Sequence, residues 1–172
     1  MLPEPFDAID LRILEELQLD AKLTNVELAS RVALSPSPCL VRVRALEQAG
    51  VIDKYVTLVN PLRVGLGVSV FIQISLERQV EAALGNFQQA MQELNEVMEC
   101  YLMTGDADYL LRVVVRDVQE LEIFIVNKLS RIEGVSSIRS SFALKQVKYK
   151  TAVPIRAAVV DRSGGRRQSR SR

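Results

Sequence analysis

Residues 24–50 read TNVELASRVALSPSPCLVRVRALEQAG, and this segment carries the start and stop signals of two helices joined by a tight turn. Thr24 and Glu27 have the spacing of a capping box, in which each side chain accepts a hydrogen bond from the other residue's backbone amide. The buried side of this helix is expected to consist of Leu28, Ala29 and Val32. The pattern therefore predicts a helix that begins just after Thr24.

The next helix is expected to begin at Ser35, because serine is a good N-cap residue and Pro36 is favoured at the first helical position. Gly50 supplies the left-handed residue that ends this helix. Its inward face is expected to hold four apolar residues, Cys39, Leu40, Val43 and Leu46. Two helices joined by so short a turn form a helix-turn-helix, although an ordinary three-helix bundle is the alternative.

The first domain is predicted to be a winged helix-turn-helix of three helices over residues 6–60. Residues 7–19 repeat apolar side chains at helical spacing, and Asp7 can cap them. Residues 51–60 alternate in the manner of a strand. Glycines mark residues 61–67 as a linker.

Residues 68–150 follow the order βαββαβ. Strands are expected over four ranges, 68–76, 97–104, 109–115 and 135–147. This order is the ferredoxin-like pattern, an antiparallel sheet with both helices on one face, so the predicted fold class is α+β. Phe71, Gln73 and Ser75 alternate away from the helices, and an uncovered, partly apolar sheet face predicts self-association.

The composition excludes several kinds of active site. The sequence has no histidine, which rules out Ser-His and Cys-His nucleophile pairs and histidine-ligated zinc. Cys39 and Cys100 lie in apolar segments and are expected to be buried free thiols in a reducing, cytoplasmic setting. No run reaches the ~18 apolar residues that span a bilayer, and the first residues lack the features of a secretory signal. We therefore expect a cytoplasmic non-enzyme with no metal, no cofactor and no membrane partner.

Charge is unevenly distributed, although the net charge is only +1. Residues 1–60 carry −3, residues 61–160 are neutral and residues 161–172 carry +4. A DNA-binding surface in the first domain must therefore rely on local basic side chains. The segment 161–172, DRSGGRRQSRSR, is expected to be a disordered basic tail. It either keeps the protein soluble or binds DNA phosphates without sequence specificity.

Two motifs resemble those of a known family. Residues 25–60, NVELASRVALSPSPCLVRVRALEQAGVIDKYVTLVN, resemble the helix-turn-helix of the leucine-responsive regulatory protein (Lrp/AsnC, feast/famine) family. The most specific part is LSPSPCLVRVRALEQAGVI. Residues 105–109, GDADY, resemble the G-D-x-D-Y turn of the same family. The resemblance covers about residues 6–150.

The resemblance implies a sequence-specific transcriptional regulator that binds double-stranded DNA and responds to a small-molecule effector, commonly an amino acid. In this family dimers form through the C-terminal sheets and often assemble into octamers. The effector commonly sits between dimers, near the G-D-x-D-Y turn. We therefore expect residues 68–150 to mediate assembly and effector sensing, with the effector shifting the assembly.

The helix after Ser35 is then expected to be the recognition helix in the major groove. Arg42 and Arg44 can bond guanine or phosphate, although Arg42 could be a solvated surface arginine and Arg44 could pair with Glu47. Ser35 and Ser37 lie at the helix N-terminus, which favours phosphate. Pro38 and Val41 could contact a thymine methyl. The predicted DNA-contacting residues are Ser35, Ser37, Pro38, Val41, Arg42 and Arg44.

The effector is expected at the turn 105–109, although glycine and aspartate also favour such turns for backbone reasons alone. Amides of the turn can hold a carboxylate, and Asp106 or Asp108 can hold an ammonium group. Neighbouring apolar residues and a second subunit would enclose the effector's side chain. The predicted effector site comprises Leu102, Met103, Thr104, Gly105, Asp106, Asp108, Tyr109, Ser136, Ser137 and Ile138.

Two other classes of function compete with this interpretation. Enzymes also use the ferredoxin-like fold, but the sequence has no histidine, no metal cluster and no glycine-rich phosphate loop. An architectural, nucleoid-like DNA-binding protein without an effector is the main alternative. It would bind DNA but respond to no amino acid.

Overall fold

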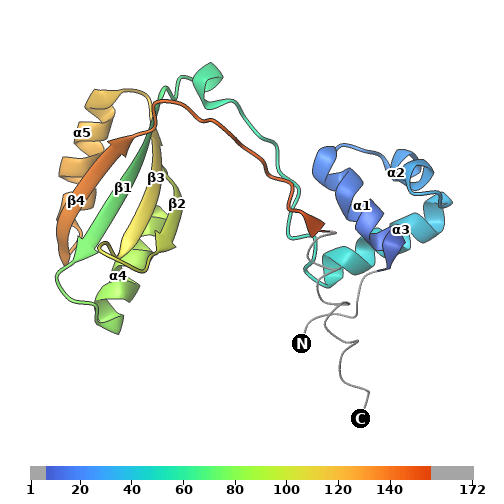
Figure 1. Ribbon diagram of the computed structural model, residues 1–172, viewed down its shortest axis with the longest axis horizontal. Helices are drawn as coiled ribbons and strands as arrows, with labels where there is room; N and C mark the ends of the chain where they lie inside the picture. Colours follow the sequence, from blue (N-terminus) through green and yellow to red (C-terminus); the bar gives the residue numbers. More distant parts are fainter. Residues whose placement is uncertain (1–6, 156–172) are drawn as a thin grey trace, which may run out of the picture. The chain divides into compact units, whose positions relative to one another are not determined.

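The structure is a computed structural model that describes residues 7–155. It divides into two compact units (Figure 1). Within the described residues, the first unit contains residues 7–57 and 148–155, and the second contains Leu58–Val147. The predicted tail, residues 161–172, lies outside the described residues. No helix in the described part is long and apolar enough to cross a membrane.

The first unit is built from three helices, α1 (Ala8–Leu19), α2 (Asn25–Arg31) and α3 (Pro36–Gln48). The capping box predicted for α2 is confirmed, because Thr24 Oγ1 accepts from the Glu27 amide and the Glu27 carboxylate accepts from the Thr24 amide. Asp7 caps α1 in the same reciprocal way with Asp10. Ser35 is the N-cap residue of α3 as predicted, but its side chain makes no capping hydrogen bond.

The core of the first unit lies where the three helices meet. Its buried residues are Ile13, Leu14, Leu28, Ala29, Val32, Cys39 and Leu46. Cys39 is thus buried as predicted. Leu40, predicted to face inward, is 38% exposed, because it lies about 100° around the helix from Cys39.

Residues 51–60 form no strand in the described structure, so the prediction of a strand there is wrong. Gly50 ends α3 with a φ of 67°. The amides of Val51 and Ile52 then both donate to the Leu46 carbonyl, at 2.9 and 3.2 Å, and both side chains pack against the helical core. Residues 53–60 are exposed, and an alternating pattern without a neighbouring strand gives no hydrogen-bonded ladder.

The second unit is a four-stranded antiparallel sheet with two helices. Its elements are β1 (Val68–Leu76), α4 (Glu81–Glu93), β2 (Val97–Leu102), β3 (Tyr109–Val115), α5 (Val118–Asn127) and β4 (Val135–Phe142). The strand order is β2-β3-β1-β4, which confirms the predicted ferredoxin-like βαββαβ fold. Two short 3-10 helices, η1 (Pro61–Val64) and η2 (Leu129–Arg131), precede β1 and β4.

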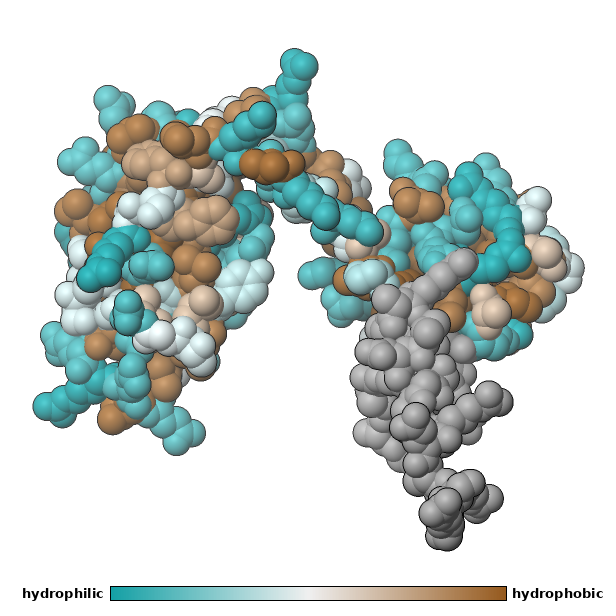
Figure 2. Space-filling view, viewed as in Figure 1, coloured by the Kyte–Doolittle hydropathy of each residue, from teal (hydrophilic) through white to brown (hydrophobic). Residues whose placement is uncertain are grey.

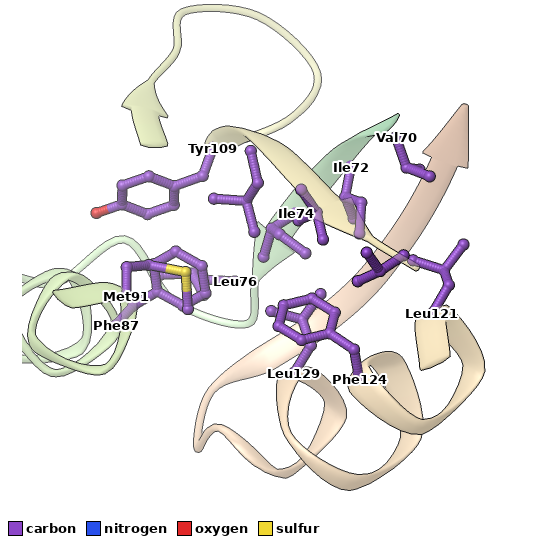
Figure 3. Packing of buried hydrophobic residues seen from close by; sticks show 13 residues of the cluster. Val70, Ile72, Ile74, Leu76, Phe87, Met91, Tyr109, Leu121, Phe124 and Leu129 are labelled. Atoms are coloured by element: carbon purple, nitrogen blue, oxygen red, sulfur yellow. The ribbon is translucent and has the colours of Figure 1, made fainter. Parts of the chain in front are cut away.

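One face of the sheet packs against both helices (Figure 3). The central strand β1 directs every second residue to this face, namely Val70, Ile72, Ile74 and Leu76. Phe87 of α4 and Phe124 of α5 meet them from the helices, and the ring of Phe87 lies 4.5 Å from that of Tyr109, centroid to centroid. Burial of each such side chain stabilises the fold by about 1.5–3 kcal/mol.

On the other face of the sheet, no helix of the described part of this unit packs. Phe71 and Gln73 of β1 point to this side as predicted, with Phe71 38% exposed. Tyr101 of the edge strand β2 is 52% exposed, and apolar residues are visible among polar ones on the surface of this unit (Figure 2). Cys100, also on β2, is exposed, so its predicted burial is wrong.

Strands β2 and β4 are both shorter than predicted. β2 ends at Leu102 rather than at residue 104, because the next amide donates to the Asp108 carbonyl at 2.8 Å and begins the turn. β4 ends at Phe142, opposite Val70, rather than at residue 147. The Ala143 amide still donates to the Ser69 carbonyl at 3.0 Å, but β1 begins at Val68, so residues 145–147 lie beyond the end of their partner strand. The alternating pattern in the sequence thus extends beyond the residues that pair with a neighbouring strand.

Candidate nucleic-acid interface and ligand site

The turn between α2 and α3 sets the orientation of α3 relative to α2. Ala33 adopts a left-handed φ of 58°, which costs about 1–2 kcal/mol for a residue other than glycine. The Leu34 amide donates to the Ala29 carbonyl at 2.9 Å, and Asn25 Nδ2 donates to the Pro36 carbonyl at 2.8 Å. These bonds tie the start of α2 to the start of α3 and hold the strained turn.

Five of the six predicted DNA-contacting residues lie exposed on or beside α3. They are Ser35, Ser37, Pro38, Val41 and Arg44. Val41 is 67% exposed, and Arg44 has no carboxylate partner among the described residues. Glu47 instead accepts a hydrogen bond from the Tyr55 hydroxyl at 2.9 Å, so the alternative in which Arg44 pairs with Glu47 is wrong.

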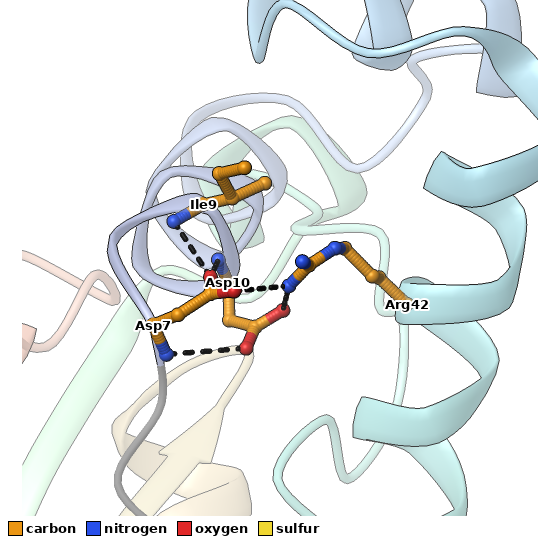
Figure 4. A network of polar contacts seen from close by, with 4 residues as sticks. All are labelled: Asp7, Ile9, Asp10 and Arg42. Carbon is orange, nitrogen blue, oxygen red and sulfur yellow. Dashed lines mark hydrogen bonds and ion pairs between the residues drawn. The ribbon is translucent and has the colours of Figure 1, made fainter.

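Arg42, the sixth predicted residue, is held by the start of α1 (Figure 4). Its Nη1 atom lies 2.7 Å from Asp7 Oδ2 and 2.8 Å from Asp10 Oδ1, and its side chain is 32% exposed. The alternative of a solvated surface arginine is therefore wrong. Both ion pairs use Nη1, so Nη2 and Nε are the Arg42 atoms that could still donate to DNA. That contact stays a prediction.

The cluster of Asp7, Asp10 and Arg42 stabilises its own charged groups. The pKa of Asp7 is lowered, first by the amide of Asp10 and then by Arg42. The pKa of Arg42 is raised, first by Asp10 and then by Asp7. Sequence reasoning missed this partnership, because capping of α1 already accounts for an acidic first turn and nothing local points to a residue of α3.

The predicted ligand turn is anchored by Asp108, which is buried. Its carboxylate accepts from the Leu76 amide at 2.7 Å and from Gln79 Nε2 at 2.6 Å, and its own amide donates to the Ile74 carbonyl. Each carboxylate oxygen therefore accepts one hydrogen bond, and these bonds fasten the turn to the end of β1. A contact of Asp108 with an ammonium group stays a prediction. Gln79 was not singled out from the sequence.

Two further predicted effector residues face the helices. Tyr109 is 1% exposed, and its hydroxyl accepts from Gln88 Nε2 at 3.0 Å. Ile138 lies opposite Ile74 on β1 and packs against the same core. Their side chains therefore belong to the helix-covered side of the sheet, and their assignment to the effector site stays a prediction.

The remaining predicted effector residues lie at one end of the sheet. Leu102, Met103, Thr104 and Asp106 are exposed, and Gly105 has a φ of 124°. Ser136 Oγ donates to the Ser75 carbonyl at 3.0 Å, and Ser137 lies opposite Ser75. The end of β1 thus separates the turn from the start of β4, which places them two strand spacings or about 10 Å apart.

Sequence models of two families match this chain. The one described as "Lrp/AsnC ligand binding domain" matches residues 69–153. The one described as "Winged helix-turn-helix DNA-binding" matches residues 6–53. The second match spans the three helices, and the first spans the sheet and continues through residues 148–153, which belong to the helical unit.

Curated relatives match along most of their length. The Bkd operon transcriptional regulator of Pseudomonas aeruginosa is 43% identical over 149 residues, which are 87% of this chain and 97% of the relative. The leucine-responsive regulatory protein of Escherichia coli is 41% identical over 150 residues, 87% of this chain and 92% of the relative.

Solved structures match as closely. A transcriptional regulator from Neisseria meningitidis in complex with L-Met has a TM-score of 0.85 and 40% identity, covering 89% of this chain and 99% of the other. An AsnC family transcriptional regulator from Agrobacterium tumefaciens has a TM-score of 0.83 and 38% identity, covering 88% and 99%.

Replacing Asp108 by alanine should destabilise the sheet unit, whereas Asp106→Ala in the same turn should not. A hydrogen bond to a charged group contributes about 1.5–3 kcal/mol, and the change leaves the Leu76 amide without its partner. We expect the free energy of unfolding, from urea titration followed by circular dichroism, to fall by about 3 kcal/mol for Asp108→Ala and by less than about 0.5 kcal/mol for Asp106→Ala. Equal effects would contradict the anchoring role.

The ion-pair cluster should make the helical unit sensitive to acid. Because the folded pKa of Asp7 is lowered, its contribution is complete above the unfolded value of about 3.9 and is lost as the pH falls through the folded value. Asp7→Asn keeps a good N-cap residue but removes the charge. The variant should have a lower melting temperature at pH 7, and the difference from the parent should vanish at the lowest pH. Asp53→Asn, which removes another exposed carboxylate of this unit, serves as the control.

Proposed function

The chain belongs to the Lrp/AsnC family of transcriptional regulators, and from this premise we propose that it binds operator DNA through α3 and responds to an amino acid with an apolar side chain. The observation that carries the DNA-binding half is the exposed surface of α3, whose position is fixed by the strained turn at Ala33. The effector half rests on the exposed end of the sheet around residues 102–106.

DNA recognition would use the side chains that α3 leaves exposed. Arg44 lacks a carboxylate partner among the described residues and can donate two hydrogen bonds to guanine or contact phosphate. Val41 and Pro38 offer apolar contact to a thymine methyl, while Ser35 and Ser37 lie at the helix N-terminus, where phosphate is favoured. Arg42 contributes chiefly by fixing α3 against α1.

Self-association supports this mode of binding. The uncovered sheet face, with Phe71 and Tyr101 exposed, is suited to pair with a second copy. A two-fold dimer that places two recognition helices about 34 Å apart would read a pseudo-palindromic operator. From the family, we also propose that four such dimers assemble into an octamer.

The effector would bind at the turn that Asp108 anchors. With that carboxylate occupied, Asp106 is the exposed carboxylate of the turn that can hold an ammonium group, and turn amides can hold the effector's carboxylate. Leu102 is 61% exposed and Met103 43%, which favours an apolar side chain. A regulator of similar structure is known in complex with L-Met.

Effector binding would change the regulator by shifting its assembly. A ligand shifts an equilibrium only as far as it binds one state more tightly than the other. A site completed by a second dimer meets that condition, because the enclosing residues are present only in the larger assembly. An effector site complete within one subunit would not couple binding to assembly.

Arg44→Ala should weaken binding to operator DNA, with Lys54→Ala as the control from the same unit. A lost bidentate contact to a base costs about 1–3 kcal/mol, a weakening of about 5- to 150-fold. We would measure affinity by fluorescence anisotropy, using duplexes that the parent chain selects from random-sequence DNA. Unchanged affinity in a folded Arg44→Ala variant would contradict the proposal that α3 contacts the DNA.

The effector should reveal itself by raising the melting temperature of the purified chain. An amino acid at about 100 times its dissociation constant adds about 2.7 kcal/mol of stability. We expect a shift with an apolar amino acid such as leucine or methionine, and loss of that shift in Asp106→Ala, which leaves the fold intact. If none of the twenty amino acids raises the melting temperature while DNA binding persists, the amino-acid effector is wrong, which leaves the architectural alternative or an effector outside the amino acids.

A further inference from the structure

Residues 162–172, RSGGRRQSRSR, form an arginine segment with five arginines and no acidic residue. The net charge of the whole chain is +1, so the other 161 residues together carry −4. The arginine segment therefore holds an excess of positive charge that the rest of the chain lacks. It also lies beyond both family matches, which end at residues 53 and 153.

The chain that leads to the arginine segment is attached to the helical unit. Gln18 of α1 holds Val153 by two hydrogen bonds: Gln18 Nε2 donates to the Val153 carbonyl at 3.3 Å, and the Val153 amide donates to Gln18 Oε1 at 2.6 Å. Ile155 packs against the three-helix core. The last described residues thus return to the unit that carries α3, and the arginine segment begins seven residues further along the chain.

The helical unit is poorly provided with positive charge for a DNA-binding module. Over its described residues, 7–57 and 148–155, it has eight basic and eight acidic side chains, so its net charge is zero. Arg31 is paired with Glu16, and Arg42 with Asp7 and Asp10. Phosphate contacts supply a large share of the affinity of DNA-binding proteins, so a module without net positive charge gains affinity from a further source of cations.

We propose that the arginine segment is a second DNA-binding element, which contacts the phosphate backbone beside the site occupied by α3. The proposal rests on the proposed function, because it presumes that α3 engages DNA. From Ile155 to residue 172 the chain can extend at most about 60 Å, whereas a unit of this size has a radius on the order of 10 Å. The segment can therefore reach the backbone on either side of the α3 footprint.

The composition of the arginine segment suits phosphate rather than bases or protein. Besides arginine it contains only glycine, serine and one glutamine, so it has no apolar side chain with which to stack on bases or to fill a protein groove. Arginine binds phosphate bidentately, and attachment at Gln18 and Ile155 makes this contact intramolecular once α3 is bound. The segment adds affinity without sequence preference.

The test replaces the five arginines by glutamine in the full chain and measures affinity for a parent-selected duplex against salt concentration. Each lost phosphate contact lowers the slope of log affinity against log salt by about 0.9, so four to five lost contacts per segment lower it by about 4. Affinity at low salt should fall by on the order of 100-fold, while the preference for selected over random DNA is kept or increased. The matched variant with five lysines should retain most of the affinity and slope.

DNA length provides a second readout. Trimming the flanks of the duplex should weaken the parent chain and bring it close to the glutamine variant, which should be indifferent to the flanks. Equal salt slopes and equal flank dependence in the two proteins would overturn the proposal. So would a change in oligomer size or melting temperature of the glutamine variant without a change in slope, since the segment would then bind the protein itself. If the parent chain binds no DNA at all, the proposed function fails first.

Discussion

The second unit depends on the position of β1 at the centre of its sheet, paired with β3 on one side and β4 on the other. Every second residue of β1 is buried against the helices, which both pack on one face of the sheet. Within the described residues of this unit, no helix packs on the opposite face. The end of β1 also carries the Leu76 amide to which Asp108 fastens the turn at residues 105–109, so the same strand positions the sheet and this turn.

The first unit uses its charges mainly within itself. The carboxylates of Asp7 and Asp10 cap α1 and hold Arg42, which joins α1 to α3. An interaction that fixes α3 against α1 thus neutralises part of the positive charge of α3. On the proposed function, stability and DNA affinity compete for Arg42. The conflict is eased if cations come from residues outside the helical unit.

Local signals in the sequence predicted most of the fold and part of the site. The capping box at Thr24 and Glu27 and the alternation along β1 depend only on neighbouring residues, and both are confirmed. The predicted strand at residues 51–60 is wrong because a strand needs a neighbouring strand to pair with, and no local pattern supplies one. The predicted burial of Leu40 is wrong because a helical residue is buried only where another element packs against it, which the local pattern does not show either. The anchoring of Asp108 was missed for the same reason: no local pattern shows that the Leu76 amide donates a hydrogen bond to its carboxylate.

The chemical type of a side chain thus indicates which contacts it can make, while its tertiary neighbours decide which it does make. Arg42 and Arg44 differ by two positions on one helix and are equally suited to DNA, yet only Arg42 has carboxylates in reach. Two residues along α3 correspond to a rotation of about 200°, enough to turn one arginine toward α1 and the other toward solvent. On the proposed function, the acidic first turn of α1 therefore determines how much of the positive charge of Arg42 is available to DNA, while Arg44 keeps its charge for that contact.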